Sequence, residues 1–190
     1  MVIKGPKPKT MEIHAETMNR FTNQHKIVKH YIDDLPSQAI HTRPSPERWS
    51  IHETIAYLCR YQYIFMDRLN TMRSEINPFF HVYNPENDPR YQFTVARSTG
   101  ALLHEIYRVR DDMKVMLSKL SPTECARFGT HAVLGRMNIC QWIEFFLLHE
   151  SHQFYKIFKL AGNFWSNNSI HHRNVISMPM AGNQMDEMAG

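Results

Sequence analysis

The residues of this sequence best suited to chemistry are two polar side chains inside its most apolar stretch. That stretch runs from Trp142 to Leu160, and its middle reads His-Glu-Ser-His-Gln. At about 3.6 residues per helical turn, His149 and Gln153 share a stripe with apolar residues, whereas His152 lies off that stripe. Polar groups that face a core need partners. The helix therefore predicts a polar network, a ligand pocket or a metal site around His149 and Gln153.

The common catalytic motifs are absent from the sequence. The segment from His149 to His152 looks like the zinc-protease motif H-E-x-x-H, but its second histidine comes one residue too early for that motif. No G-x-G-x-x-G, Walker A or G-x-S-x-G pattern occurs. The sequence therefore gives no support to the common nucleotide-binding, zinc-protease or serine-hydrolase classes.

Composition indicates one globular domain. The chain has 190 residues, of which 43% are hydrophobic and 21% charged, and a net charge of +4 with scattered Lys and Arg. No apolar run approaches the roughly 18 to 20 residues of a membrane span, and the basic N-terminus lacks the apolar core of a signal peptide. The three Cys show no C-x-x-C spacing, which fits a reducing compartment. We expect a cytoplasmic protein without nucleic-acid or membrane partners.

Hydrophobic periodicity predicts an all-α protein, a four-helix bundle with a long loop between its second and third helices. The four expected helices cover residues 10–35, 50–73, 95–119 and 138–162. Ser50 and Glu53 form a capping box at the start of the second, and Gly162-Asn163 is expected to end the last. No convincing strand pattern occurs. The segment 128–136 is expected to be a loop, with a small extended excursion as the alternative.

The chain is expected to divide into three parts. They are a Pro/Lys-rich lead (1–9), the bundle (10–165) and a polar, Met-rich tail (166–190). The loop at 74–93 is unusually long, and loops of that length in a compact domain are commonly functional or disordered. Its several aromatic residues predict that it packs onto the bundle as a lid.

Two segments resemble the DinB-like (YfiT-like) superfamily. Trp49–Leu58 is similar to the W-S-x-x-E-x-x-x-H-L opening of that family's second helix, and Gly135–His149 followed by Ile157 resembles its last core helix. Asn77-Pro78-Phe79 resembles its loop. The resemblance implies an up-up-down-down four-helix bundle, a homodimer and a pocket where three histidines hold nickel or zinc. Some members are transferases or isomerases that use a low-molecular-weight thiol.

This chain departs from the family pattern at the three metal positions. Tyr57 stands where the second helix carries a histidine, His149 is retained, and Gln153 replaces the third histidine. Nickel and zinc prefer imidazole, thiolate and carboxylate, whereas an amide oxygen binds weakly and a phenol must first lose its proton. We therefore expect no metal cofactor and a mutually hydrogen-bonded Tyr57, His149 and Gln153. Nickel or zinc at His149 is the family-based alternative.

Other polar residues on these helices have structural interpretations. His52 lies in the first turn of its helix and is expected to face the surface, although a rebuilt metal site from His52, His149 and His152 is a minor alternative. The arginines of the second helix are expected to form a solvated face; they are Arg60, Arg68 and Arg73.

Two functions remain open at this point. In the first, the chain binds a small molecule or partner in a pocket lined by Tyr57, His149 and Gln153 beneath the 74–93 loop, with His52 and His152 as further candidate site residues. The alternative, implied by the resemblance, is a metal- and thiol-dependent transferase or isomerase with altered ligands.

Overall fold

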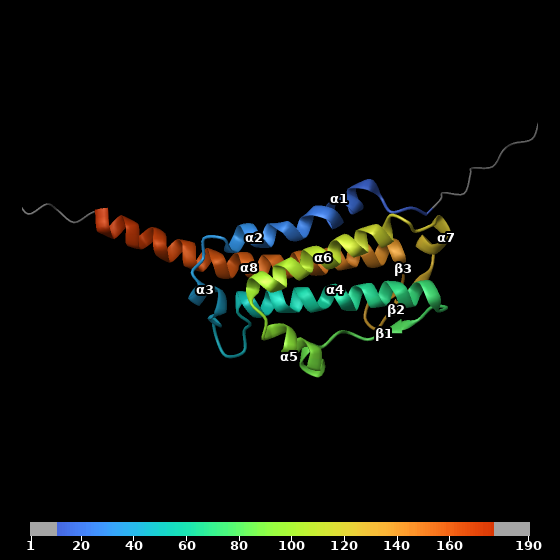
Figure 1. Ribbon diagram of the computed structural model, residues 1–190, viewed down its shortest axis with the longest axis horizontal. Helices are drawn as coiled ribbons and strands as arrows, with labels where there is room; N and C mark the ends of the chain where they lie inside the picture. Colours follow the sequence, from blue (N-terminus) through green and yellow to red (C-terminus); the bar gives the residue numbers. More distant parts are fainter. Residues whose placement is uncertain (1–10, 177–190) are drawn as a thin grey trace, which may run out of the picture.

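Four helical rods pack side by side in the computed structural model, which describes residues 11–176, with side chains as far as Ser166 (Figure 1). The rods are α1 and α2 (Ala15–Asn23 and Ile27–Ile32, joined by the 3-10 turn η1, Gln24–Lys26), α4 (Ile51–Ser74), α6 (Thr99–Leu117) and α8 (Ile139–Ile176). Two short helices, α3 (Ser37–His41) and α7 (Pro122–Cys125), lie in the connections. The predicted four-helix bundle is confirmed, although its first helix is interrupted by η1.

Contacts between helix ends define the direction of each rod. Thr17 of α1 donates a hydrogen bond to Glu144 of α8, near the start of both helices. His52 of α4 bonds to the hydroxyl of Thr99 at the start of α6. The order along the chain is therefore up-down-down-up, as the colours of Figure 1 also show. The expected up-up-down-down order is wrong, because the segment between α4 and α6 crosses back along α4 before α6 begins.

The crossing segment is structured and packs on the bundle, as its aromatic residues predicted. It contains β1 (Phe79–Phe80), the 3-10 turn η2 (Pro85–Asn87) and α5 (Pro89–Val95). Arg60 of α4 forms a 2.6 Å ion pair with Asp88, which also accepts a hydrogen bond from the Tyr83 hydroxyl. Ser98 caps α6, so the expected helix start at Val95 belongs instead to the end of α5.

A small sheet lies at the end of the bundle where α4 stops and α8 starts. β2 (Phe128–His131) pairs in parallel with β1 and antiparallel with β3 (Gly135–Asn138). The expectation of no strands is wrong, and the extended alternative for 128–136 is the one observed. Gly135 has a φ of +74°, a conformation that glycine adopts without strain, and this allows the tight β2–β3 turn.

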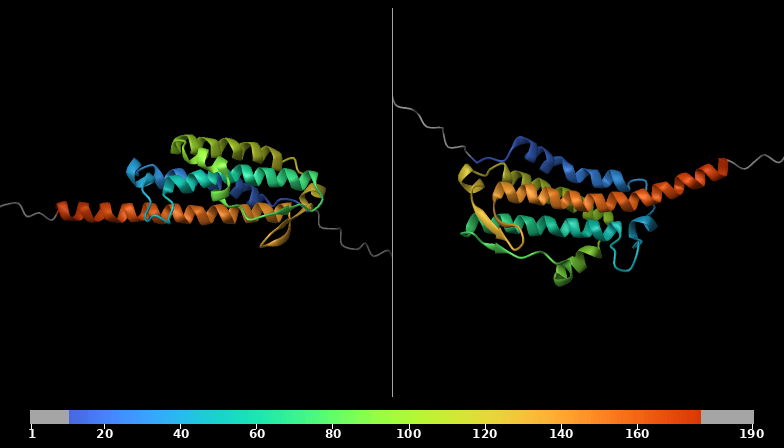
Figure 2. Two further views of the ribbon diagram at one scale, coloured as in Figure 1. Left: turned by 90° about the horizontal axis from the view of Figure 1, so that it is seen from below. Right: turned by 180° about the vertical axis from the view of Figure 1, so that it is seen from behind.

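Helix α8 is longer than its sequence predicted. Asn138 and Gln141 cap its start by exchanging backbone-to-side-chain hydrogen bonds, as expected. The expected end at Gly162-Asn163 is wrong, since the helix continues to Ile176 and projects beyond the other rods (Figure 2). A helix tolerates an interior glycine at a cost of about 1 kcal/mol. The remaining part of the expected tail, 177–190, and the expected lead, 1–9, lie outside the described residues.

A buried ion pair joins α6 to α8 in the middle of the bundle. Arg110 and Glu150 are each 1% exposed, and the guanidinium of Arg110 donates to the Glu150 carboxylate. The Gln62 amide donates to the same carboxylate and accepts from Arg110, and Gln24 donates to its second oxygen. Every rod of the bundle is therefore tied to one polar centre.

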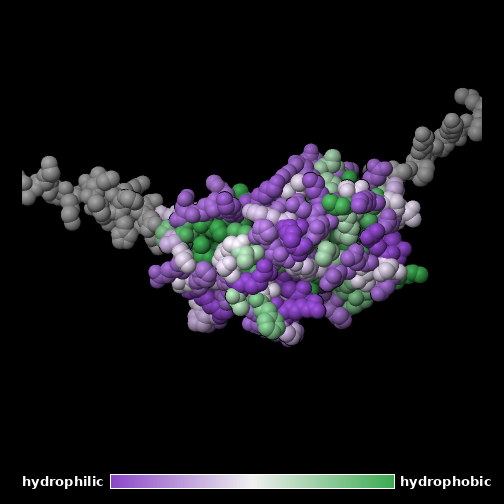
Figure 3. All heavy atoms as spheres, in the orientation of Figure 1, coloured by the Kyte–Doolittle hydropathy of each residue, from purple (hydrophilic) through white to green (hydrophobic). Residues whose placement is uncertain are grey.

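The face of the molecule drawn in Figure 3 is largely hydrophilic, with a compact apolar cluster on the left and smaller apolar areas elsewhere. Among the helices of residues 11–176, none combines the length and the apolar character that crossing a membrane requires.

Candidate functional site

The inward turn of α8 lies against aromatic side chains of α4. Gln153 is 5% exposed and His149 is half-buried, which confirms the inward register expected for this pair. The imidazole of His149 stacks on the ring of Tyr61 at a centroid distance of 4.3 Å and lies 5.6 Å from the ring of Tyr57. The structure therefore brings Tyr57 and His149 into contact, by ring packing.

The expected hydrogen bonds among Tyr57, His149 and Gln153 are not formed. Nε2 of His149 and Oε1 of Gln153 are both buried, and neither has a hydrogen-bond partner among the described residues. The tyrosines present their ring faces to the imidazole instead, which satisfies packing but not the polar atoms. Two unpaired polar atoms on adjacent turns of one helix are the chief chemical feature of this site.

An arginine that sequence reasoning placed on the surface lies beside the site. Arg68 is only 7% exposed; its guanidinium donates to the His81 carbonyl at 2.7 Å and to the Tyr61 hydroxyl at 3.3 Å. It also lies 5.6 Å from the ring centroids of Phe80 and Trp142. The solvated face expected for the α4 arginines is wrong at Arg68 and also at Arg60, whose side chain is 11% exposed in its pair with Asp88. The spacing of seven residues between Tyr61 and Arg68 places both on the same helix face, a signal that could have found Arg68.

The crossing segment completes an aromatic wall around Tyr57. The ring of Tyr83 lies 5.8 Å from Tyr57 and 5.9 Å from Tyr61. From the other side, Trp49 lies 5.2 Å from Tyr57 and 5.8 Å from Tyr91. Burial raises the pKa of Tyr57, so its phenol keeps its proton at neutral pH.

The two other candidate histidines do not join His149. His52 is 7% exposed, so the expected surface position is wrong; its two ring nitrogens bond to the Thr99 hydroxyl and the Val95 carbonyl, both at 2.8 Å. These bonds tie the start of α4 to the connection between α5 and α6. His152 is exposed, on another face of α8. Within the described residues, the structure does not assemble a metal site from His52, His149 and His152.

The residues at the family's metal positions do not fit a divalent cation. Among residues 11–166, no group of three His, Cys, Asp or Glu side chains is placed to hold a metal ion. Burial, followed by the charges of His152, Lys156 and Arg68, lowers the pKa of His149 to about 4. The donor set is thus one imidazole, one neutral amide and one protonated phenol, with two permanent cations close by. Such surroundings disfavour a doubly charged ion.

The lowered pKa of His149 makes the stability of the fold dependent on pH. Unfolded His149 gains a proton near its ordinary pKa of 6.5, whereas the folded side chain resists protonation down to about 4. Stability is therefore expected to fall as the pH drops through that window. His25, with a pKa lowered by burial to about 3, contributes in the same direction. Urea unfolding of the wild type and of His149→Gln at neutral and acidic pH should show a smaller loss in the variant; equal losses would contradict the assignment to His149.

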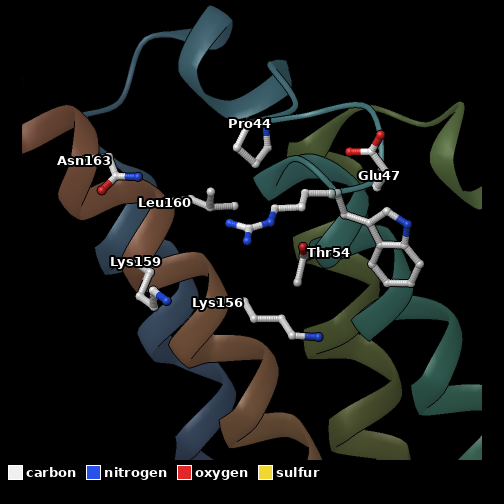
Figure 4. Close-up of a pocket in the computed structure, with 9 residues that line it drawn as sticks. Pro44, Glu47, Thr54, Lys156, Lys159, Leu160 and Asn163 are labelled. Carbon is white, nitrogen blue, oxygen red and sulfur yellow. The ribbon is translucent and has the colours of Figure 1, made fainter.

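A cavity of about 500 Å³ adjoins the aromatic wall. It lies between the 44–49 segment, the start of α4 and the later turns of α8 (Figure 4). Trp49 lines the cavity and also packs on Tyr57. Lys156 also lines the cavity, and its charge contributes to the lowered pKa of His149. Tyr57, His149 and Gln153 are not among its lining residues. The cavity therefore does not contain the unpaired polar atoms of His149 and Gln153.

Comparison with known proteins gives this architecture a family. No curated protein matches the chain. A solved structure does: "YfiT from Bacillus subtilis is a probable metal-dependent hydrolase with an unusual four-helix bundle topology" matches with a TM-score of 0.70 at 13% identity, over 85% of this chain and 95% of that one. At that identity the match shows the shared fold. The family model of the DinB superfamily matches residues 20–154, most of the bundle. The chain belongs to the DinB superfamily.

Proposed function

We propose that this protein binds a small molecule at Tyr57, His149 and Gln153, without the three-histidine metal site of its family. The observation that supports the proposal is the pair of buried atoms, His149 Nε2 and Gln153 Oε1, with no partner among the described residues. A buried polar atom without a hydrogen bond costs about 1–3 kcal/mol. A bound molecule that bonds to both atoms would remove that cost, so ligand binding would stabilise the protein.

The two atoms restrict the chemistry of that ligand. Gln153 Oε1 only accepts hydrogen bonds, so the ligand must offer a donor such as a hydroxyl or an amino group. His149 is neutral at pH 7 and can donate or accept at Nε2, depending on its tautomer. The stacked rings of Tyr57 and Tyr61 favour a flat or apolar body beside the donor.

The alternative function is a metal- and thiol-dependent transferase or isomerase that uses altered ligands. It has the support of the family and of the YfiT description as a probable metal-dependent hydrolase. Against it stand the weak donors at Tyr57 and Gln153 and the cations near His149. Elemental analysis of the purified, untagged protein separates the two. Stoichiometric nickel or zinc that disappears in His149→Leu would establish the alternative; a content far below one per chain supports the proposal.

A fragment screen by ligand-observed NMR tests binding directly. We expect hydroxyl- or amine-bearing aromatic fragments to bind the wild type and to bind His149→Leu at least about tenfold more weakly, since each lost hydrogen bond costs about 1 kcal/mol and the packing also changes. The matched control is His104→Leu, an exposed histidine of α6, which should bind as the wild type does. If no fragment binds in a manner that depends on His149, the proposal is wrong.

The family resemblance further suggests a homodimer, and the cysteine usage of the sequence suggests a cytoplasmic location. Helix α8 exposes three large apolar side chains, Leu148, Tyr155 and Phe158, at 63%, 60% and 46%. Exposed apolar side chains on one helix support an interface on α8, because apolar surface that gathers on one element marks association sites. A monomer in sizing with light scattering would exclude the dimer.

A further inference from the structure

The cavity next to the aromatic wall is basic. Arg48, Lys156 and Lys159 all line it, and Glu47 is the one carboxylate that the described part of the chain adds to its lining. In the view of Figure 4, Lys156 reaches from α8 toward Thr54 of α4, while the carboxylate of Glu47 lies at the opposite rim. The lining therefore has a net charge of about +2 at neutral pH.

The three cations have no ion-pair partner among residues 11–166. Seven other Arg and Lys side chains of residues 11–166 form ion pairs, including Arg43 with Glu53 and Arg60 with Asp88. Arg48, Lys156 and Lys159 form none among the described residues, although Lys159 lies over the ring of Tyr155 at 5.5 Å. All three side chains are exposed and solvated, and together they give the hollow a positive charge that attracts anions. Their position around one hollow favours an anionic occupant.

The rest of the lining is suited to an apolar body. Trp49 supplies a half-buried indole, and Pro44 and Leu160 supply aliphatic surface. The Thr54 hydroxyl already donates to the Ser50 carbonyl, so it offers a ligand only its acceptor lone pairs. Asn163 adds a side-chain amide at the edge (Figure 4). A volume of about 500 Å³ lies within the usual range for small-molecule sites.

We propose that this cavity binds a small organic anion, a carboxylate or a phosphate, with its charge among Arg48, Lys156 and Lys159 and its apolar body against Trp49 and Leu160. The inference rests on the proposed ligand binding at this part of the bundle, and it adds the chemical class of the ligand. The link between the two sites is physical: Trp49 contacts Tyr57, and Lys156 lies three residues, about one turn, after Gln153. The cavity and the two unpaired atoms are thus neighbouring features along α8, and the experiment below tests them separately.

Binding of matched naphthalene probes tests the inference. 2-Naphthoate and 2-naphthyl phosphate carry the two candidate anions, and 2-naphthamide is their neutral counterpart. By calorimetry at low salt, we expect the better anion to bind the wild type at least about fivefold more tightly than the amide, and the preference to shrink at high salt because exposed charges are screened. Lys156→Gln should reduce the preference about two- to fivefold, and Arg48→Gln with Lys156→Gln should abolish it.

Lys114→Gln on α6 is the control, since Lys114 is also exposed and without an ion pair among residues 11–166 but lies outside the cavity lining. It should keep the full preference. Equal binding of amide and anions, no saturable binding of either anion, or equal loss in Lys114→Gln and Lys156→Gln overturns the inference. Amide binding that depends on His149 without an anion preference would leave the proposed function standing while the anion site falls. An anion preference that persists in His149→Leu would support the cavity and count against the role of His149.

Discussion

Glu150→Gln is expected to lower the free energy of unfolding by about 3–5 kcal/mol, the usual cost of removing one partner of a buried ion pair. Arg110 is 1% exposed, and burial lowers its pKa because it disfavours the charged guanidinium. Among residues 11–166, the Glu150 carboxylate is the one anion to which it is paired. Without that charge, the guanidinium stays buried among Phe21, Phe146 and neutral groups. The folded state then loses the attraction that offsets the cost of burying the guanidinium charge. Urea unfolding followed by circular dichroism measures the change.

Two further variants separate a buried charge effect from ordinary surface electrostatics. Arg110→Met combined with Glu150→Leu should recover much of the loss, because apolar residues of similar size can replace a buried pair without leaving a charge behind. Asp33→Asn breaks the exposed pair with Lys29, whose side chains are 54% and 63% exposed, and should cost less than about 1 kcal/mol. A cost for Glu150→Gln as small as that of Asp33→Asn would contradict a structural role for the pair.

The helix ends and the inward stripe of α8 could be read from the sequence because both depend on neighbours a few residues apart. Ser50 and Glu53 cap α4 by reciprocal hydrogen bonds, and Gln153 lies inward as its spacing predicts. The spacing from Tyr61 could have placed Arg68 on the inward face, but the polar partners of Arg68 and Glu150 could not be read in this way. Those partners, the His81 carbonyl and Arg110, lie 13 residues or more away along the chain, and no local pattern encodes them.

The small sheet and the length of α8 escaped prediction for related reasons. β1 has two residues, and its pairing of Phe79 with Thr130 joins segments about 50 residues apart, so no alternation within it signals a strand. Gly162 resembles a helix stop, yet nothing lies within 4 Å of where its side chain would be, and α8 continues past it. The same limit applies to the candidate site: the sequence named His149 and Gln153, but only the fold shows their polar atoms unpaired and Trp49 beside Tyr57.

Gln153→Met is expected to make the unliganded protein more stable, by about 1–2 kcal/mol, and to weaken ligand binding at least about tenfold. Gln153 Oε1 is buried without a partner among the described residues, so the folded state bears its desolvation cost. Methionine has a similar length and a flexible apolar chain, so it can fill the same space one turn after His149 without that cost. Thermal and urea unfolding measure the first effect, and titration with the best fragment from the NMR screen measures the second.

The opposite signs of these two effects distinguish a ligand site from a structural one. If the Gln153 amide served the fold, its replacement would destabilise the protein, and this result would contradict the proposed function. Gln92→Met on α5 replaces an exposed glutamine and should change stability by less than about 0.5 kcal/mol without affecting binding. In the proposed function, Gln153 Oε1 lowers the stability of the unliganded protein and raises the affinity for the ligand. The amide then serves binding, because methionine at this position would give a more stable bundle.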